Sequence, residues 1–335
     1  MDNVNISDEN GIRIVHAGID EALGRDWRKE QPDVDLVRVK DPDITAWQPL
    51  REAGFTVKPG WITWLAPACA SEEDFLMRMS RRSQRGARSS AAALAERGVT
   101  LASRSPLDPT QMDEFLTVYE AHVATLRNGV PFARRFRERL LDRPEDYFMV
   151  RAEDADGDLV GACLCEIDAT MSIVRVRFTA LGTGERDGNL ARSLYLTAFQ
   201  ETRERGHRWI SLGSDPSTYG HLVQPGLFVF KSRFGLFPVP LKLLQPNAHP
   251  VQAADEADLV LRLIALSDPS LHIAYHGDAP TSHATDAAWL REDAQQDPEP
   301  AISLHLEVLS RDAEIDTNAY RAGFLRRTTL RVIDA

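Results

Sequence analysis

The length of this chain, 335 residues, predicts more than one compact part, since domains typically hold about 100–200 residues. Hydrophobic residues make up 43% and charged residues 27%, which excludes collagen-like, coiled-coil and wholly disordered proteins. The net charge of −11 argues against general binding of duplex DNA, because phosphate neutralisation needs a basic surface. No apolar run approaches the ~20 residues that span a bilayer. The N-terminal segment is polar and acidic, so we expect a cytoplasmic protein without a membrane partner.

The cysteine pattern offers no sign of a metal site. Cys69, Cys163 and Cys165 lack the C-x-x-C or histidine spacing of structural zinc ligands. Their odd number also argues against a disulfide framework. We therefore expect no metal and interpret the cysteines as small buried hydrophobic residues.

Charge is distributed unevenly along the chain. Residues 251–335 hold 15 acids and seven arginines, whereas residues 78–104 hold seven arginines and the single acid Glu96. Helical spacing places Arg81, Arg85 and Arg88 on one face of a predicted helix. That face is either an ordinary solvated surface or an anion site. The anion would be a diphosphate, a tRNA acceptor stem or the acidic C-terminal region of the same chain.

The predicted elements form a mixed α/β (α+β) arrangement. The first ten residues have the composition of a flexible tail. The next elements, in chain order, are a strand at 35–40, a helical turn at 44–54, a strand at 60–67 and one helix that opens at Ser71 and carries the arginines. A regular pattern follows: strand 97–104, a helix starting at Asp108-Pro109, a shorter helix at 133–143, a hairpin of strands 147–153 and 159–167, and strand 173–182.

The second half of the pattern begins with a glycine-bearing loop at 182–188. It continues with helix 189–206, closed by Gly206, then strand 207–213, helix 227–235, strand 237–244, an acidic helix at 254–267, a polar linker at 276–300 and a strand at 301–309. We interpret 1–96 as a partial domain with a basic helix at 71–96, 97–245 as the main domain, and 246–335 as a region that packs with the N-terminal part. These end pieces are expected to form a second, smaller unit.

Several segments resemble a known superfamily. The order of elements over 97–245 is similar to that of GNAT acyltransferases. The segments VRVRFTAL, RDGNLARSLYLTAFQETRERGHRWISLGSDPSTYG and LFVFKSRFGLFPVPL resemble the Fem-like branch, which contains peptidoglycan aminoacyltransferases. FLMRMSRRSQRGARSSAAALAERGVTL resembles the basic helix that precedes the transferase domain of Fem-like proteins. The resemblance implies a GNAT-type mixed sheet flanked by helices and a second, smaller or partial GNAT-like unit.

The resemblance also implies a reaction, the transfer of an acyl or aminoacyl group to an amine of a small molecule or peptide. The co-substrate would be acyl-CoA, an acyl-carrier thioester or aminoacyl-tRNA, with no permanently bound cofactor. Partners would then include a carrier protein or a tRNA. A GNAT fold that has kept only a binding role remains an alternative.

The loop before helix 189–206 is the implied donor site. Backbone amides at a helix start attract a diphosphate, although an ordinary turn explains the glycines equally well. The superfamily pattern is [RQ]-x-x-G-x-[GA], whereas this chain has its glycine one position early and an aspartate beside it. The implied donor contacts are Arg186, Gly188, Asn189, Ala191 and Arg192.

The resemblance places the oxyanion donors on the backbone of a splayed strand at 176–181. An amine has a pKa near ~10.4, so amide formation needs a base. The candidate bases are Glu166, Asp215 and His221, with Tyr219 as the acid for the leaving group and Tyr195 as the second choice. The candidate substrate contacts are Arg177, Lys231 and Tyr119. Each has a structural alternative: Asp215 caps a turn, His221 is a surface residue, and Glu166 is the solvent-facing member of an alternating strand.

Overall fold

The chain divides into two compact units, each described separately. One comprises Trp64–Gly213 with Arg233–Leu236, and the other comprises Met1–Thr63, Ser214–Ser232 and Phe237–Ala335. The computed structural model describes residues 5–9, 12–34, 36–40, 42, 44–58, 61–126, 129–182, 188–216, 225–240, 259–263, 272–277, 304–310, 314, 318, 322 and 325–332.

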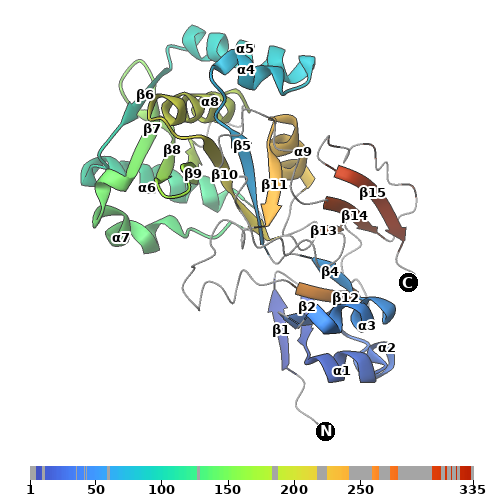
Figure 1. Cartoon of the computed structure of the whole chain (residues 1–335). Helices are drawn as coiled ribbons and strands as arrows, with labels where there is room; N and C mark the ends of the chain where they lie inside the picture. Colours follow the sequence, from blue (N-terminus) through green and yellow to red (C-terminus); the bar gives the residue numbers. More distant parts are fainter. Residues whose placement is uncertain are drawn as a thin grey trace. The chain divides into compact units, whose positions relative to one another are not determined.

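A seven-stranded mixed sheet forms the main part of the fold (Figure 1). Its strand order is β11-β5-β10-β9-β8-β7-β6. The strands are β5 (Trp61–Pro67), β6 (Thr100–Arg104), β7 (Tyr147–Glu153), β8 (Leu159–Asp168), β9 (Ile173–Leu181), β10 (Trp209–Pro216) and β11 (Phe237–Pro240). β6 to β9 are antiparallel neighbours, and β10 runs parallel to β9 after a helical crossover. The predicted mixed α/β class, a mixed sheet with flanking helices, is confirmed.

One face of the hairpin β7–β8 is covered by α6 (Pro109–Ala124). Asp108 caps this helix, since its Oδ1 accepts the amides of Thr110 and Gln111 at 2.9 and 3.0 Å. The core on this face contains Met112, Phe115, Leu116, Met149, Ala162 and Leu164. After α6 come η2 (Ala133–Phe136), α7 (Arg137–Leu141) and η3 (Pro144–Asp146).

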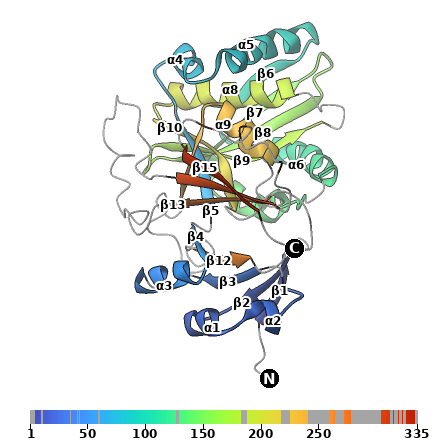
Figure 2. The same cartoon turned by 90° about the vertical axis from the view of Figure 1, so that its right-hand side faces the viewer.

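The other face is covered by α8 (Gly188–Glu204), and α4 (Glu72–Met77) and α5 (Arg81–Glu96) pack on α8 (Figures 1 and 2). A Cβ at Gly161 of β8 would lie 3.0 Å from a methyl carbon of Leu190, so the glycine lets helix and strand approach closely. Cys163 lies beside it, with Sγ 3.8 Å from the carbonyl oxygen of Leu194. Because strand residues alternate between faces, Cys163 and Leu164 face opposite helices.

The single helix expected over 71–96 is wrong, because two helices occupy this range. Ser71 caps α4, and its hydroxyl accepts the amide of Asp74. Ser80 caps α5 in the same way, by accepting the amide of Ser83 at 3.2 Å. A second N-cap starts a new helix after the break at 78–80.

The other unit contains a five-stranded sheet of order β1-β2-β3-β12-β4. Its strands are β1 (Asn5–Glu9), β2 (Ile12–His16), β3 (Leu36–Lys40), β4 (Thr56–Lys58) and β12 (Leu259–Leu263). The flexible tail predicted for residues 1–10 is therefore wrong over Asn5–Glu9, which pair with β2. The helices of this part are α1 (Ile19–Gly24), α2 (Trp27–Glu30), η1 (Ile44–Ala46) and α3 (Trp47–Glu52).

The acidic helix predicted at 254–267 is also wrong where the structure describes it. β12 is antiparallel to both β3 and β4. The sequence LVLRL suits either period, and hydrogen bonding on both edges decides for a strand. Residues 259–263 from the C-terminal region thus share one sheet with N-terminal strands. The predicted domain boundaries and the GNAT-like second unit stay predictions.

A three-stranded sheet, β13-β14-β15, completes the described elements together with α9 (Pro225–Arg233). Its strands are β13 (His272–Gly277), β14 (Leu304–Ser310) and β15 (Leu325–Val332). The strand predicted at 301–309 corresponds to β14. The predicted linker overlaps β13 at 276–277, and the rest of it lies outside the described residues. Among the described helices, none is long and apolar enough to cross a membrane.

The close approach of α8 to β8 makes Gly161 sensitive to substitution. We expect Gly161→Val to lower the free energy of unfolding by about 1–3 kcal/mol, since overpacking forces the backbones apart. Gly24→Ala is the control, because a Cβ there meets no atom within 4 Å. Chemical denaturation measures both variants, and equal stability of Gly161→Val and the wild type would contradict the packing.

Two half-buried histidines should make stability depend on pH. Burial lowers the pKa of His122, and burial together with Arg205 lowers the pKa of His207, which Asp168 partly opposes. Below the ordinary pKa of about 6.5 the unfolded chain binds protons that the folded chain does not, so stability is full above this pH and falls on acidification. The double variant His122→Gln/His207→Gln should flatten the fall in melting temperature just below pH 6.5, and an unchanged slope would exclude these groups as its cause.

Candidate functional site

An extra residue interrupts the pairing of β8 with β9. Leu164 pairs with Phe178 and Cys165 pairs with Val176, so Arg177 has no residue of its own opposite it. Such a β-bulge bends the strand and turns side chains into new directions. Bulges are enriched beside active sites, which makes this position the starting point for a candidate site.

The neighbouring strand is irregular at the same level. The pairing of β9 with β10 covers Ile173–Arg175 and Trp209–Ser211 in the part of the chain that the structure describes. Gly213 follows with φ +77°, and a Cβ there would lie 3.4 Å from the carbonyl oxygen of Val176. A non-glycine residue would be strained in this conformation. β9 and β10 therefore both leave regular β geometry near Val176.

Beside the bulge, Arg177 contacts Glu166 of β8. Arg177 Nη1 lies 3.2 Å from Glu166 Oε2, and the two side chains are 38% and 27% exposed. Glu166 is the cross-strand partner of both Arg175 and Tyr147. A partly exposed carboxylate therefore stands between an arginine and a tyrosine.

Tyr147 is the buried member of this group. Burial raises the pKa of its phenol, the charge of Glu166 raises it further, and Arg177 and Arg139 partly oppose the rise. Tyr147 therefore keeps its proton at neutral pH and adds no negative charge beside Glu166. The sequence interpretation did not include Tyr147, although the hairpin register set by the Asp-Gly turn places it opposite the end of β8.

A second ion pair lies next to the first. Arg175 Nη2 is 2.8 Å from Asp168 Oδ2, and the Arg175 side chain is only 11% exposed. Asp168 also accepts the amide of Met171 at 3.0 Å. These contacts account structurally for Arg175, whereas Arg177 has one long contact and a more exposed side chain.

Tyr119, predicted as a substrate contact, packs near the bulge. Its ring meets Phe178 edge to face, with centroids 5.6 Å apart. Burial is the main cause that raises the pKa of its phenol, and the backbone of Phe132 and Ala133 partly opposes the rise. The role of Tyr119 as a substrate contact stays a prediction.

At the implied donor site, the first turn of α8 contacts α5. The Oγ of Ser90 lies 3.0 Å from both Asn189 Oδ1 and Arg192 Nη1. Arg192 Nη1 also lies 3.4 Å from the carbonyl oxygen of Gly86. Asn189 and Arg192, two of the residues predicted to contact the acyl donor, thus contact α5 instead. Of the other two described residues, Gly188 is exposed and Ala191 is half-buried.

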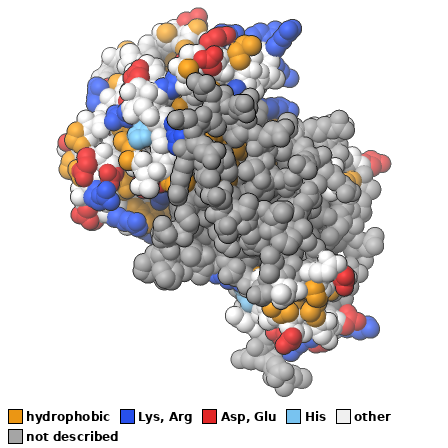
Figure 3. Space-filling view, viewed as in Figure 1, with side chains coloured by type: hydrophobic (Ala, Val, Ile, Leu, Met, Phe, Trp, Pro, Cys, Tyr) orange, Lys and Arg blue, Asp and Glu red, His pale blue; other side chains and the backbone are white. Residues whose placement is uncertain are grey.

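The basic face of α5 is only partly as expected. Arg81 and Arg85 are exposed, and Figure 3 shows basic side chains over α4 and α5 at the top of the molecule. Arg88 instead donates to both carboxylate oxygens of Glu73 on α4, at 2.7 and 2.8 Å. The acidic partner of Arg88 thus comes from the preceding helix, outside the arginine-rich stretch 78–104.

Of the remaining predicted residues, the structure describes the side chains of Lys231 and Tyr195. Arg186, Tyr219 and His221 lie outside the described residues, and Asp215 is placed in β10 without a described side chain. Lys231 is a buried residue of α9. Tyr195 contacts Thr179 of β9 through its hydroxyl at 3.2 Å. Among the described residues, no cluster of histidine, cysteine or acidic side chains suits a metal ion.

No protein-family model matches the sequence. No curated protein is significantly similar to it. Solved structures do match. The C-terminal domain of a putative lysylphosphatidylglycerol synthetase from Agrobacterium fabrum is 12% identical with a TM-score of 0.39, over 77% of this chain and 80% of that one. FemX is 12% identical with a TM-score of 0.42, over 70% and 80%.

A putative acetyltransferase of the GNAT family from Desulfovibrio desulfuricans is 19% identical with a TM-score of 0.28, over 33% of this chain and 71% of that one. At these identities the likeness concerns the fold alone. FemX and this GNAT-family protein belong to the groups that the sequence resembles.

A double-mutant cycle can separate a functional pair from a structural one at Glu166 and Arg177. We expect Glu166→Gln and Arg177→Met to show a coupling of about 0.2–1 kcal/mol in unfolding free energy, because both side chains are partly exposed to water. The pair Glu73 and Arg88, which is more exposed, is the control. A coupling of several kcal/mol would mean that the pair serves stability.

Proposed function

We propose that this protein is an N-acyltransferase that forms an amide. The donor is an activated thioester, acyl-CoA or carrier-bound, and the acceptor is an amine of a small molecule or peptide. The observation that carries the proposal is the β-bulge at Arg177, which lies beside Glu166 and its cross-strand partner Tyr147. Attack of an amine on a carbonyl uses a base and N–H donors for the developing oxyanion, and a bulge frees backbone groups from strand pairing.

In the proposed mechanism, the acceptor nitrogen attacks the thioester carbonyl directly. The carbon–nitrogen bond forms, the carbon–sulfur bond breaks, and the proton from nitrogen passes to Glu166. Arg177 orients the Glu166 carboxylate through its contact of 3.2 Å. Backbone amides near the bulge stabilise the oxyanion, and Tyr219 returns a proton to the leaving thiolate. Asp215 and His221 stay alternative bases.

Two alternative functions, aminoacyl transfer from tRNA and binding without catalysis, are each favoured by one observation. The exposed Arg81 and Arg85 favour an aminoacyl-tRNA donor, against the acidic total charge. The engagement of Asn189 and Arg192 with α5, together with the early glycine, favours a binding module without catalysis.

The proposed chemistry can be tested by thiol release from a panel of acyl thioesters in the presence of amines. Glu166→Gln should lower turnover at least tenfold, since the amine loses its proton acceptor. Asp215→Asn and His221→Ala should each do the same if they are the base instead. Glu204→Gln, an exposed carboxylate on α8, is the matched control and should leave the rate unchanged.

Full activity of Glu166→Gln would remove this residue from the mechanism. Failure with every thioester should be repeated with charged tRNA and carrier-protein donors. A tRNA donor predicts affinity that falls steeply with salt, whereas flat dependence argues against it. Inactivity with all donors would leave the binding module.

A further inference from the structure

The segment that follows α6 exposes three large apolar side chains. Leu126, Val130 and Phe132 are 48%, 43% and 47% exposed. Only four other large hydrophobic residues are exposed in the described parts of the chain, and they are scattered over distant segments. Isolated exposed apolar residues are ordinary, but three within seven positions of one segment need an explanation. We call these three side chains the patch.

The chain holds this patch in place at both ends. The amide of Gly129 donates to Leu126, and the amide of Phe132 donates to Val130 at 2.9 Å. A Cβ at Gly129 would lie 2.2 Å from the carbonyl oxygen of Val123, so only glycine fits against the end of α6. The other end is held by the amide of Arg135, which donates to the carbonyl oxygen of Phe132 at 3.0 Å. The exposure therefore belongs to the folded segment rather than to a frayed end.

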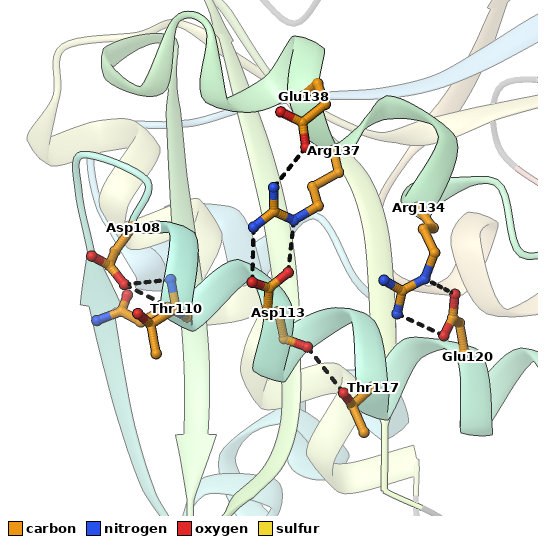
Figure 4. A network of polar contacts seen from close by, with 9 residues as sticks. Asp108, Thr110, Asp113, Thr117, Glu120, Arg134, Arg137 and Glu138 are labelled. Carbon is orange, nitrogen blue, oxygen red and sulfur yellow. Dashed lines mark hydrogen bonds and ion pairs between the residues drawn. The ribbon is translucent and has the colours of Figure 1, made fainter.

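The patch lies in a second basic stretch of the chain, which follows the arginines of α5 in sequence. Residues 125–143 contain six arginines and two acids, a net charge of +4 in a chain of −11. Figure 4 shows that Arg134 and Arg137 turn back to α6, where Glu120 and Asp113 bind them. These two ion pairs fix the basic segment to the helix.

Two further arginines stay directed to solvent. Arg135 and Arg139 are exposed, and no acid pairs with either among the described residues. The Arg135 guanidinium carbon lies 5.6 Å from the centre of the Phe132 ring, so one cation stands directly at the apolar patch. Apolar and cationic groups are thus presented side by side.

We infer that Leu126, Val130 and Phe132, with Arg135 and Arg139, form a docking surface for a negatively charged lipid bilayer. Apolar side chains that enter the boundary of headgroups and acyl chains, ringed by arginines that attract anionic headgroups, are the chemistry of such contacts. An RNA would use the arginines, but Leu126 and Val130 are aliphatic and offer no ring for base stacking. The surface does not include Glu166 or Arg177 of the proposed mechanism, and it differs from the sequence expectation of no membrane partner.

The test uses the full chain in co-sedimentation with vesicles of phosphatidylglycerol and phosphatidylcholine, compared with phosphatidylcholine alone. The wild type should sediment with the mixed vesicles and much less with the neutral ones. Leu126→Ser/Phe132→Ser should lower the affinity at least tenfold, because the inserted area is lost. Arg135→Glu should lower it by about fivefold or more for the charge.

Met77→Ser is the matched control, since Met77 is 66% exposed on α4, outside this surface. Its binding should equal that of the wild type, and thermal melting should show that every variant is folded. Equal sedimentation of the wild type and Leu126→Ser/Phe132→Ser would overturn the inference. So would tRNA binding in a gel shift that needs Arg135 but not Leu126, with no vesicle binding.

Discussion

One extra residue in β9 sets the geometry on which the candidate site depends. If β8 and β9 paired one to one, Arg177 would take a regular place in the ladder. The shift between Leu164 and Cys165 instead leaves it outside the register, beside Glu166. A bulge costs a regular hydrogen-bonded pair, and it is retained in folds where the displaced side chain has a use. The left-handed Gly213 on the adjacent strand places a second irregularity at the same level.

The contact between α5 and α8 bears on how a donor would bind. Ser90, Asn189 and Arg192 form a small polar cluster at the start of α8. Side chains used in this way hold the basic helix on the fold and are less free to bind a diphosphate. A donor held here would rely more on backbone amides at the helix start, which need no particular side chain.

Positive charge in this acidic protein is gathered at two places with different surroundings. On α5, arginines are separated by small polar and alanine residues, so this surface offers positive charge without large exposed apolar side chains. After α6, the exposed apolar side chains Leu126, Val130 and Phe132 are followed by the exposed Arg135 and Arg139, which suits an interface that is partly dry. The difference in neighbours is what separates a solvated or polyanion-binding face from a lipid-facing one.

The sequence by itself determined the elements whose signals are local. Asp108-Pro109 marks the start of α6, and the Asp-Gly turn marks the hairpin β7–β8, because caps and turns depend on a few adjacent residues. Only the tertiary structure decided that 259–263 is a strand, since its partners Leu36–Lys40 are more than 200 positions away. The bulge at Arg177 and the contact of Glu73 with Arg88 were decided there too. Each depends on the register or docking of separate elements, which no local pattern records.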